Sequence, residues 1–77
     1  MNDEKLLIIA KKLQEERVVS FRLYNALYII TSEKENVFIH QEGIDVVYTY
    51  SSLNELLEKY VVYGSKLFYV LDDIILC

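Results

Sequence analysis

The chain has 77 residues, so we expect one domain spanning residues 1–77. Hydrophobic residues make up 53% of it, with no proline and only two glycines, a composition that argues against disorder and flexible linkers. The 12 acidic and 8 basic residues give a formal net charge of −4. Because phosphate neutralisation supplies most of the affinity of nucleic-acid-binding proteins, an acidic chain with scattered bases is a poor candidate for that class.

Cysteine usage and the N-terminal residues indicate the compartment. Cys77 is the only cysteine, so an intrachain disulfide is excluded. The apolar run at residues 6–10 is shorter than the core of a signal peptide and far shorter than the about 20 apolar residues of a membrane span. These features predict a cytoplasmic protein without a membrane partner.

The first expected element is a helix over residues 3–17. Apolar residues recur there at helical spacing and form one stripe: Leu6, Ile9, Ala10 and Leu13. Asn2 or Asp3 is a suitable cap for its first turn. The remaining faces carry charges of both signs, which is typical of a solvated face, and a partner site there is the alternative.

Residues 18–50 are rich in β-branched and aromatic side chains and predict four strands. The strands are expected at residues 18–24, 27–31, 37–41 and 44–50. Turns are expected between them at residues 25–26, 32–36 and 42–43. Because connections this short cannot form parallel crossovers, the pattern favours an antiparallel meander.

A second helix is indicated by residues 52–55, Ser-Leu-Asn-Glu, which fit the S-x-x-E capping box. Its apolar stripe would consist of Leu53, Leu56, Leu57 and Tyr60. Gly64 is expected to end this helix in the left-handed conformation. Residues 65–77 fit either a helix or a short strand, and the spacing of their apolar residues favours the helix.

Together these elements predict an α+β fold in two layers: a helix, a four-stranded antiparallel meander, a helix and a C-terminal helix or short strand. We expect the helices to cover one face of the sheet, formed by Val19, Phe21, Leu23, Leu27, Ile29, Val37 and Ile39. A register slip of one residue in any strand would exchange the two faces of that strand.

No motif in the chain specifies a reaction. His40 is the only histidine, and its sequence neighbours offer no cluster for metal binding or acid–base catalysis. The adjacent Asp72 and Asp73 point in different directions on a helix or a strand, so we do not expect them to share one site. The serines lack a nucleophile elbow and the two glycines make no phosphate-binding loop. We therefore expect no catalytic residues, no cofactor and no metal, and a protein that is not an enzyme.

The opposite face of the expected sheet is the one surface that suggests a function. It would carry Arg22, Tyr24, Tyr28, Phe38 and His40. Tyrosine and arginine are enriched at protein interfaces, and large exposed apolar patches usually mark interaction sites. The pattern predicts an interaction patch with Tyr24 and Tyr28 as its anchors. The alternatives are that the C-terminal segment covers this face or that the strand registers slip.

These observations predict a small acidic protein that acts by binding, as an interaction or regulatory module. Its partner would be another protein or a second copy in a homodimer. The alternative is a nucleic-acid-associated protein that stacks bases on an aromatic sheet face.

Overall fold

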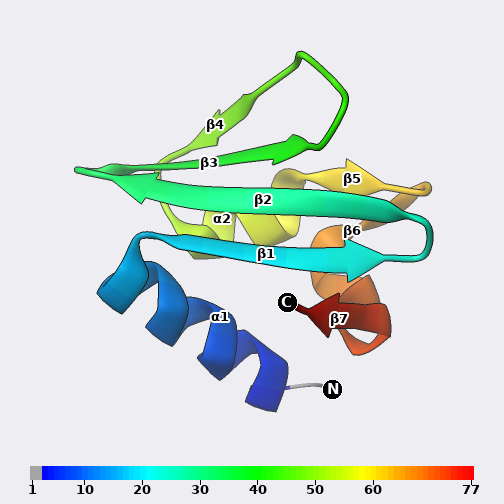
Figure 1. Ribbon diagram of the computed structural model, residues 1–77, viewed down its shortest axis with the longest axis horizontal. Helices are drawn as coiled ribbons and strands as arrows, with labels where there is room; N and C mark the ends of the chain where they lie inside the picture. The colour runs from blue at the N-terminus through cyan, green and yellow to red at the C-terminus, as the bar shows by residue number, and fades with distance from the viewer. Residues whose placement is uncertain (1–2) are drawn as a thin grey trace.

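Five antiparallel strands form the main sheet in the order β4-β3-β2-β1-β7 (Figure 1). The structure, a computed structural model, describes residues 3–77. The strands are β1 (Val18–Leu23), β2 (Ala26–Glu33), β3 (Asn36–Gln41), β4 (Tyr48–Tyr50) and β7 (Ile74–Leu76). The α+β class and the antiparallel sheet are thus confirmed. The expected four-strand meander is extended by β7, which returns from the end of the chain to pair with β1.

Two helices, a 3-10 helix and a short hairpin complete the fold. They are α1 (Asp3–Glu16), α2 (Leu53–Lys59), η1 (Leu67–Asp73) and the hairpin of β5 (Val61–Val62) and β6 (Ser65–Lys66). Their apolar residues join those of one sheet face in a single core. The described residues therefore form two layers, and the other sheet face has no helix over it.

Helix α1 lies almost where the sequence places it. Ile9 and Leu13 are buried, but Ala10 is exposed, so the expected stripe is wrong at that position. The helix ends because Arg17 adopts a left-handed conformation, with φ of 67°, and its N–H donates to the Leu13 carbonyl oxygen at 3.1 Å. The expected capping by Asn2 or the Asp3 side chain lies outside the described residues.

The turn between β1 and β2 corrects the expected register. Leu23 pairs directly with Ala26, so the turn consists of Tyr24 and Asn25 and not of residues 25–26. Residues that pair directly across two antiparallel strands lie on the same face, so Tyr28 shares the face of its partner Phe21, and Leu27 shares that of Arg22. Tyr28 and Ile30 are consequently buried under the helices, whereas Leu27 and Ile29, which we expected there, lie half-buried on the other face.

The next two connections also differ in length from the sequence prediction. Glu33 pairs with Asn36, so the loop at residues 32–36 contracts to a two-residue turn in which Lys34 has φ of 56°. The fourth strand is much shorter than residues 44–50, because β4 begins only at Tyr48. Residues 42–47 instead form an exposed loop. We call this segment the β3–β4 loop.

Helix α2 begins as predicted but ends earlier. The Ser52 hydroxyl accepts the Glu55 N–H at 3.1 Å, as in a capping box. The Glu55 carboxylate accepts the N–H of Ser51, at 2.9 Å, rather than that of Ser52. The helix ends at Lys59, and Gly64 lies in the β5–β6 turn, with φ of 76°. The prediction that Gly64 terminates the helix is therefore wrong.

The C-terminal segment contains both structures that the sequence left open, first the 3-10 helix η1 and then β7. Lysines of α1 attach it to the N-terminal part of the chain. The Lys5 ammonium donates to the carbonyl oxygens of Asp72, at 2.9 Å, and Ile74, at 2.6 Å. Lys12 donates to the Cys77 oxygen at 3.2 Å. These contacts hold α1 against the edge of the sheet formed by β7.

Candidate functional site

The structure does not bring the five residues of the expected interaction patch together. Arg22, Phe38 and His40 do lie on the uncovered sheet face. Tyr28 lies on the opposite face and is only 2% exposed, so it belongs to the core and cannot anchor a partner on the uncovered face. Tyr24 is in the β1–β2 turn, and its hydroxyl donates to Asp73 at 2.8 Å. The patch as predicted from the sequence is therefore not one surface.

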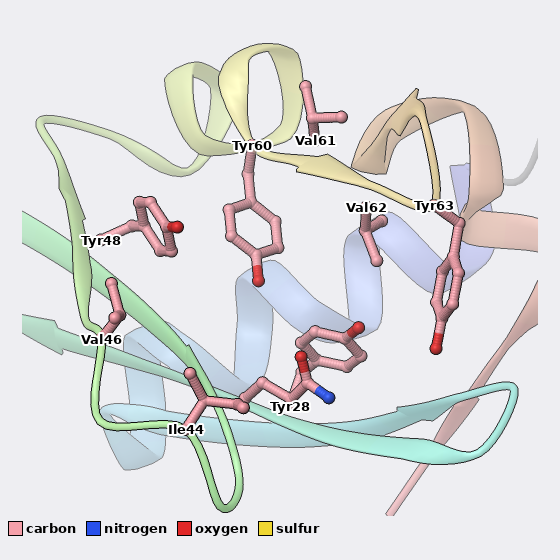
Figure 2. A pocket seen from close by; sticks show the side chains of 9 residues that line it. Tyr28, Ile44, Val46, Tyr48, Tyr60, Val61, Val62 and Tyr63 are labelled. Carbon is pink, nitrogen blue, oxygen red and sulfur yellow. The ribbon is translucent and has the colours of Figure 1, made fainter.

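Residues from three parts of the chain instead surround a pocket of about 370 Å³ on the helix-covered side of the sheet (Figure 2). Four of its lining residues are tyrosines: Tyr28, Tyr48, Tyr60 and Tyr63. The other lining residues are aliphatic apart from one amide: Gln41, Ile44, Val46, Val61 and Val62. We call this site the tyrosine pocket.

Local backbone structure explains why the pocket is open. Since β4 is short, the β3–β4 loop carries Ile44 and Val46 away from the sheet (Figure 2). On the other side, the chain leaves α2 at Tyr60 in an extended conformation and turns back at Tyr63 and Gly64, whose φ angles are 53° and 76°. The loop and this hairpin form the two walls, and Tyr28 contributes from β2 between them.

Ring packing fixes the positions of the tyrosines. The Tyr60 ring meets the Tyr48 ring edge to face, with centroids 5.3 Å apart, and the Tyr28 ring at 6.4 Å. Tyr63 packs edge to face against Tyr24 at 5.0 Å. Such arrangements match the positive edge of one ring with the negative face of the next. The pocket is therefore largely preformed.

Burial raises the pKa of the phenols at the base of the pocket further above neutral pH. It is the main cause that raises the pKa of Tyr28 to about 12, with smaller contributions from the hydroxyls of Tyr63 and Tyr60. Burial likewise raises the pKa of Tyr60, helped by Tyr48 and Tyr50. At neutral pH these hydroxyls are uncharged groups that donate and accept hydrogen bonds.

The rim of the pocket is apolar and exposed. Its side chains have exposed fractions of 47% to 61%: Tyr48, Ile44, Val46, Val61 and Tyr63. Isolated exposed hydrophobic residues are ordinary, but a group of them around a concave site marks an interaction surface. The pocket thus combines an apolar rim with an interior of neutral hydrogen-bonding groups.

Other kinds of site find less support in the described residues. Within residues 3–77, no group of three or more His, Cys, Asp and Glu side chains is placed to hold a metal ion. None of the helices there is both long and apolar enough to cross a membrane. A second pocket, beside α2 and including Leu6 and Tyr69, has a volume of only about 180 Å³.

The sequence contained one signal for the tyrosine pocket. Val61, Val62 and Tyr63 continue the apolar character of α2 after its stripe ends at Tyr60. Because the helix ends at Lys59, these residues lie outside it: Val62 is buried in the core, whereas Val61 and Tyr63 are exposed. A helix that continues to Gly64 would include residues 61–63, so the expected helix end hides this signal.

Comparison with known proteins identifies no relative: no family model matches the chain, and neither a curated protein nor a solved structure is significantly similar to it.

Proposed function

We propose that the protein is a binding module without catalytic activity, and that its tyrosine pocket receives a side chain of a partner protein. The observation that carries this proposal is the concentration of exposed apolar side chains around one concave site. Such a site buries an anchoring side chain and excludes water around it, which is how a few residues dominate the affinity of protein interfaces. The partner is another protein or a second copy of this chain.

The chemistry of the lining supports binding rather than catalysis. No acidic, basic or histidine side chain lines the pocket. General acid–base catalysis is most efficient when a group has a pKa near the working pH, whereas the pKa of Tyr28 is about 12. A group of this kind holds a ligand by hydrogen bonding and does not exchange protons with it at neutral pH.

Nucleic-acid binding through the uncovered sheet face is the weaker proposal. A base would have to stack on an aromatic ring of this face. Tyr28 lies in the core and cannot take that role, whereas Phe38 does lie on the uncovered face. The net charge of −4 also opposes association with phosphates. Fluorescence anisotropy with duplex and single-stranded probes at about 150 mM salt tests this, and micromolar affinity that falls steeply with added salt would support it.

The experiment that tests the proposed function first identifies a partner. A photo-reactive amino acid at position 63 is used to cross-link the partner in the cells that produce the protein, and the same residue at position 69 serves as the control. Tyr63 and Tyr69 are similarly exposed, at 61% and 67%, but only Tyr63 lines the tyrosine pocket. Sedimentation velocity then determines whether the partner is a second copy.

The affinity of the purified partner is next measured by calorimetry with matched variants. We expect Tyr63→Ser and Val61→Ser to weaken binding by at least about fivefold, since truncated anchors cost more than ~1 kcal/mol. Tyr69→Ser and Ile75→Ser change equally exposed residues outside the pocket and should leave the affinity nearly unchanged. Equal effects of both pairs would contradict the proposal.

A further inference from the structure

We infer that the tyrosine pocket takes a cationic side chain, arginine or lysine, from a basic segment of the partner. This inference rests on the proposed function and specifies the chemistry of the bound group. Three features of the described residues support it: the aromatic rings of the pocket, its neutral oxygen acceptors, and the sign of the charges beside it.

Aromatic rings are the first feature. The negative face of a tyrosine ring attracts a cation that lies within about 6 Å of the ring centroid. Tyr48 and Tyr63, on opposite walls, are about half exposed, and Figure 2 shows Tyr60 between them. The chain already contains one such contact on its surface, where the Lys66 ammonium lies 6.0 Å from the centroid of the Tyr69 ring.

Oxygen acceptors are the second feature. Arginine and lysine carry several N–H donors and no acceptor, so a site for them must supply oxygen atoms. The phenol oxygens of the lining tyrosines and the amide oxygen of Gln41 are such acceptors. The aliphatic residues of the walls, such as Val46 and Val61, suit the methylene stem of the same side chain.

The sign of the local charge is the third feature. Glu42 and Asp45 belong to the loop that forms one wall, and both are exposed. Residues 41–48 and 60–63, which provide all the lining except Tyr28, contain these two acids and no lysine or arginine. Two lysines flank the second range, but Lys59 forms an ion pair with Glu55 and the Lys66 ammonium lies over the Tyr69 ring, outside the pocket. Together with the net charge of −4, they attract a basic segment and repel an acidic or phosphorylated one.

A cationic side chain and a purely apolar one would bind the pocket with different affinities. A leucine or norleucine side chain would also fill the pocket, but it would gain nothing from the ring faces, the acceptors or the two acids. A cation should therefore be preferred to a neutral group of the same shape. This preference is the quantity that an experiment must measure.

The test uses n-butylguanidinium and its neutral analogue n-butylurea, which share the alkyl stem and the planar head. Each is titrated at millimolar concentration into the full 15N-labelled chain, and binding is followed from amide chemical shifts. We expect n-butylguanidinium to bind about threefold to thirtyfold more tightly, the ratio that corresponds to one cation–π contact. The shifts should centre on residues 44–48 and 60–63.

Two variants attribute the preference to the pocket. Tyr63→Leu keeps an apolar rim but removes one ring, so it should reduce the preference for the cation and leave n-butylurea binding little changed. Tyr69→Leu, equally exposed and outside the tyrosine pocket, is the control. The same spectra show whether Tyr63→Leu disturbs the fold. If it does, Tyr48→Leu is used in its place, and it should likewise reduce the preference for the cation.

The outcomes distinguish this inference from the proposed function. Equal or tighter binding of n-butylurea at the pocket overturns the cationic inference and leaves the pocket as an apolar docking site. If neither probe shifts the pocket residues at millimolar concentration, the inference is also overturned, and the affinity measurements with the natural partner decide the proposed function independently. The cationic inference is supported if n-butylguanidinium binds more tightly than n-butylurea, and if this preference is lost in Tyr63→Leu but kept in Tyr69→Leu.

Discussion

Phe21 and Tyr28 face each other across β1 and β2, with ring centroids 5.3 Å apart and ring planes 13° from parallel. Both side chains are at most 2% exposed. This stacked pair joins the central strands of the core and also places the Tyr28 hydroxyl in the tyrosine pocket. A single residue therefore contributes to both the stability of the sheet and the chemistry of the candidate site.

The first prediction follows from this pairing. Tyr28→Ala should lower the free energy of unfolding by roughly 3–5 kcal/mol, because a buried aromatic ring is replaced by a cavity. Leu27→Ala, at the adjacent position on the uncovered face, should cost less than half as much. Chemical denaturation of both variants is the measurement. A larger loss for Leu27→Ala would mean that Leu27, and not Tyr28, faces the core.

Alternation of the side chains predicted the faces of β1 and β3 from the sequence, but it did not predict the faces of β2. Alternation placed Val19, Phe21 and Ile39 correctly in the core. In β2 the residues Leu27 to Ile30 are all hydrophobic, so alternation alone does not distinguish the two registers. Turn length does distinguish them, because a two-residue turn at 24–25 or at 25–26 pairs Tyr28 with Phe21 or Leu23, which are both core residues. The expected faces of β2 were therefore inconsistent with the expected two-residue turn.

The pocket was not predictable from the sequence for a related reason. It depends on where β4 begins and where α2 ends, and element boundaries depend on tertiary packing more than on local preference. Ile44 and Val46 have the pattern of a strand, yet they lie in the β3–β4 loop. Once these two boundaries are known, the four tyrosines come together in space from β2, β4 and the segment after α2.

The second prediction concerns alkaline pH. The pKa of Tyr28 is about 12 in the folded chain, against an ordinary value of 10.0. Between these values the unfolded chain releases a proton that the folded chain retains, so rising pH favours unfolding. The contribution of Tyr28 is complete below pH 10 and is lost as the pH rises through 12, a loss of roughly 2–3 kcal/mol. Denaturation curves at several pH values measure it.

Tyr28→Phe is the control for the alkaline loss, because it preserves the stacked pair with Phe21 and removes the ionisable group. This variant should lose less stability between pH 10 and 12 than the parent, because the ionisable group of Tyr28 is absent. Some loss should remain, because Tyr60 and Tyr50, whose pKa values are also raised, still ionise. Identical pH profiles for the two proteins would show that Tyr28 is not the responsible group.

The third prediction tests the start of α2. Ser52→Ala removes the acceptor of the Glu55 N–H and should cost roughly 0.5–2 kcal/mol of stability. Ser52→Asp retains an acceptor at the same position and adds a negative charge near the helix N-terminus, so it should be close to the parent. Thermal and chemical denaturation compare the three proteins. Equal stability of the Ala and Asp variants would argue against the cap.

The fourth prediction concerns the β2–β3 turn, in which Lys34 has φ of 56°. This left-handed conformation costs a non-glycine residue roughly 1–2 kcal/mol, more than the entropy that glycine loses on folding. Lys34→Gly should therefore stabilise the protein by up to about 1 kcal/mol. Glu35→Gly, at the next position, lacks this benefit because φ is not positive there, and it should destabilise the protein. Matching effects of the two glycine substitutions would contradict the turn geometry.

The measurement that tests the central claim most directly is the footprint of the partner on the 15N-labelled chain, mapped by chemical-shift perturbation and by amide hydrogen exchange. The tyrosine pocket predicts that the strongest perturbation and protection fall on residues 44–48 and 60–63, on the helix-covered side. A footprint centred on Arg22, Leu27 and Phe38 would place the interaction on the uncovered sheet face and contradict the account.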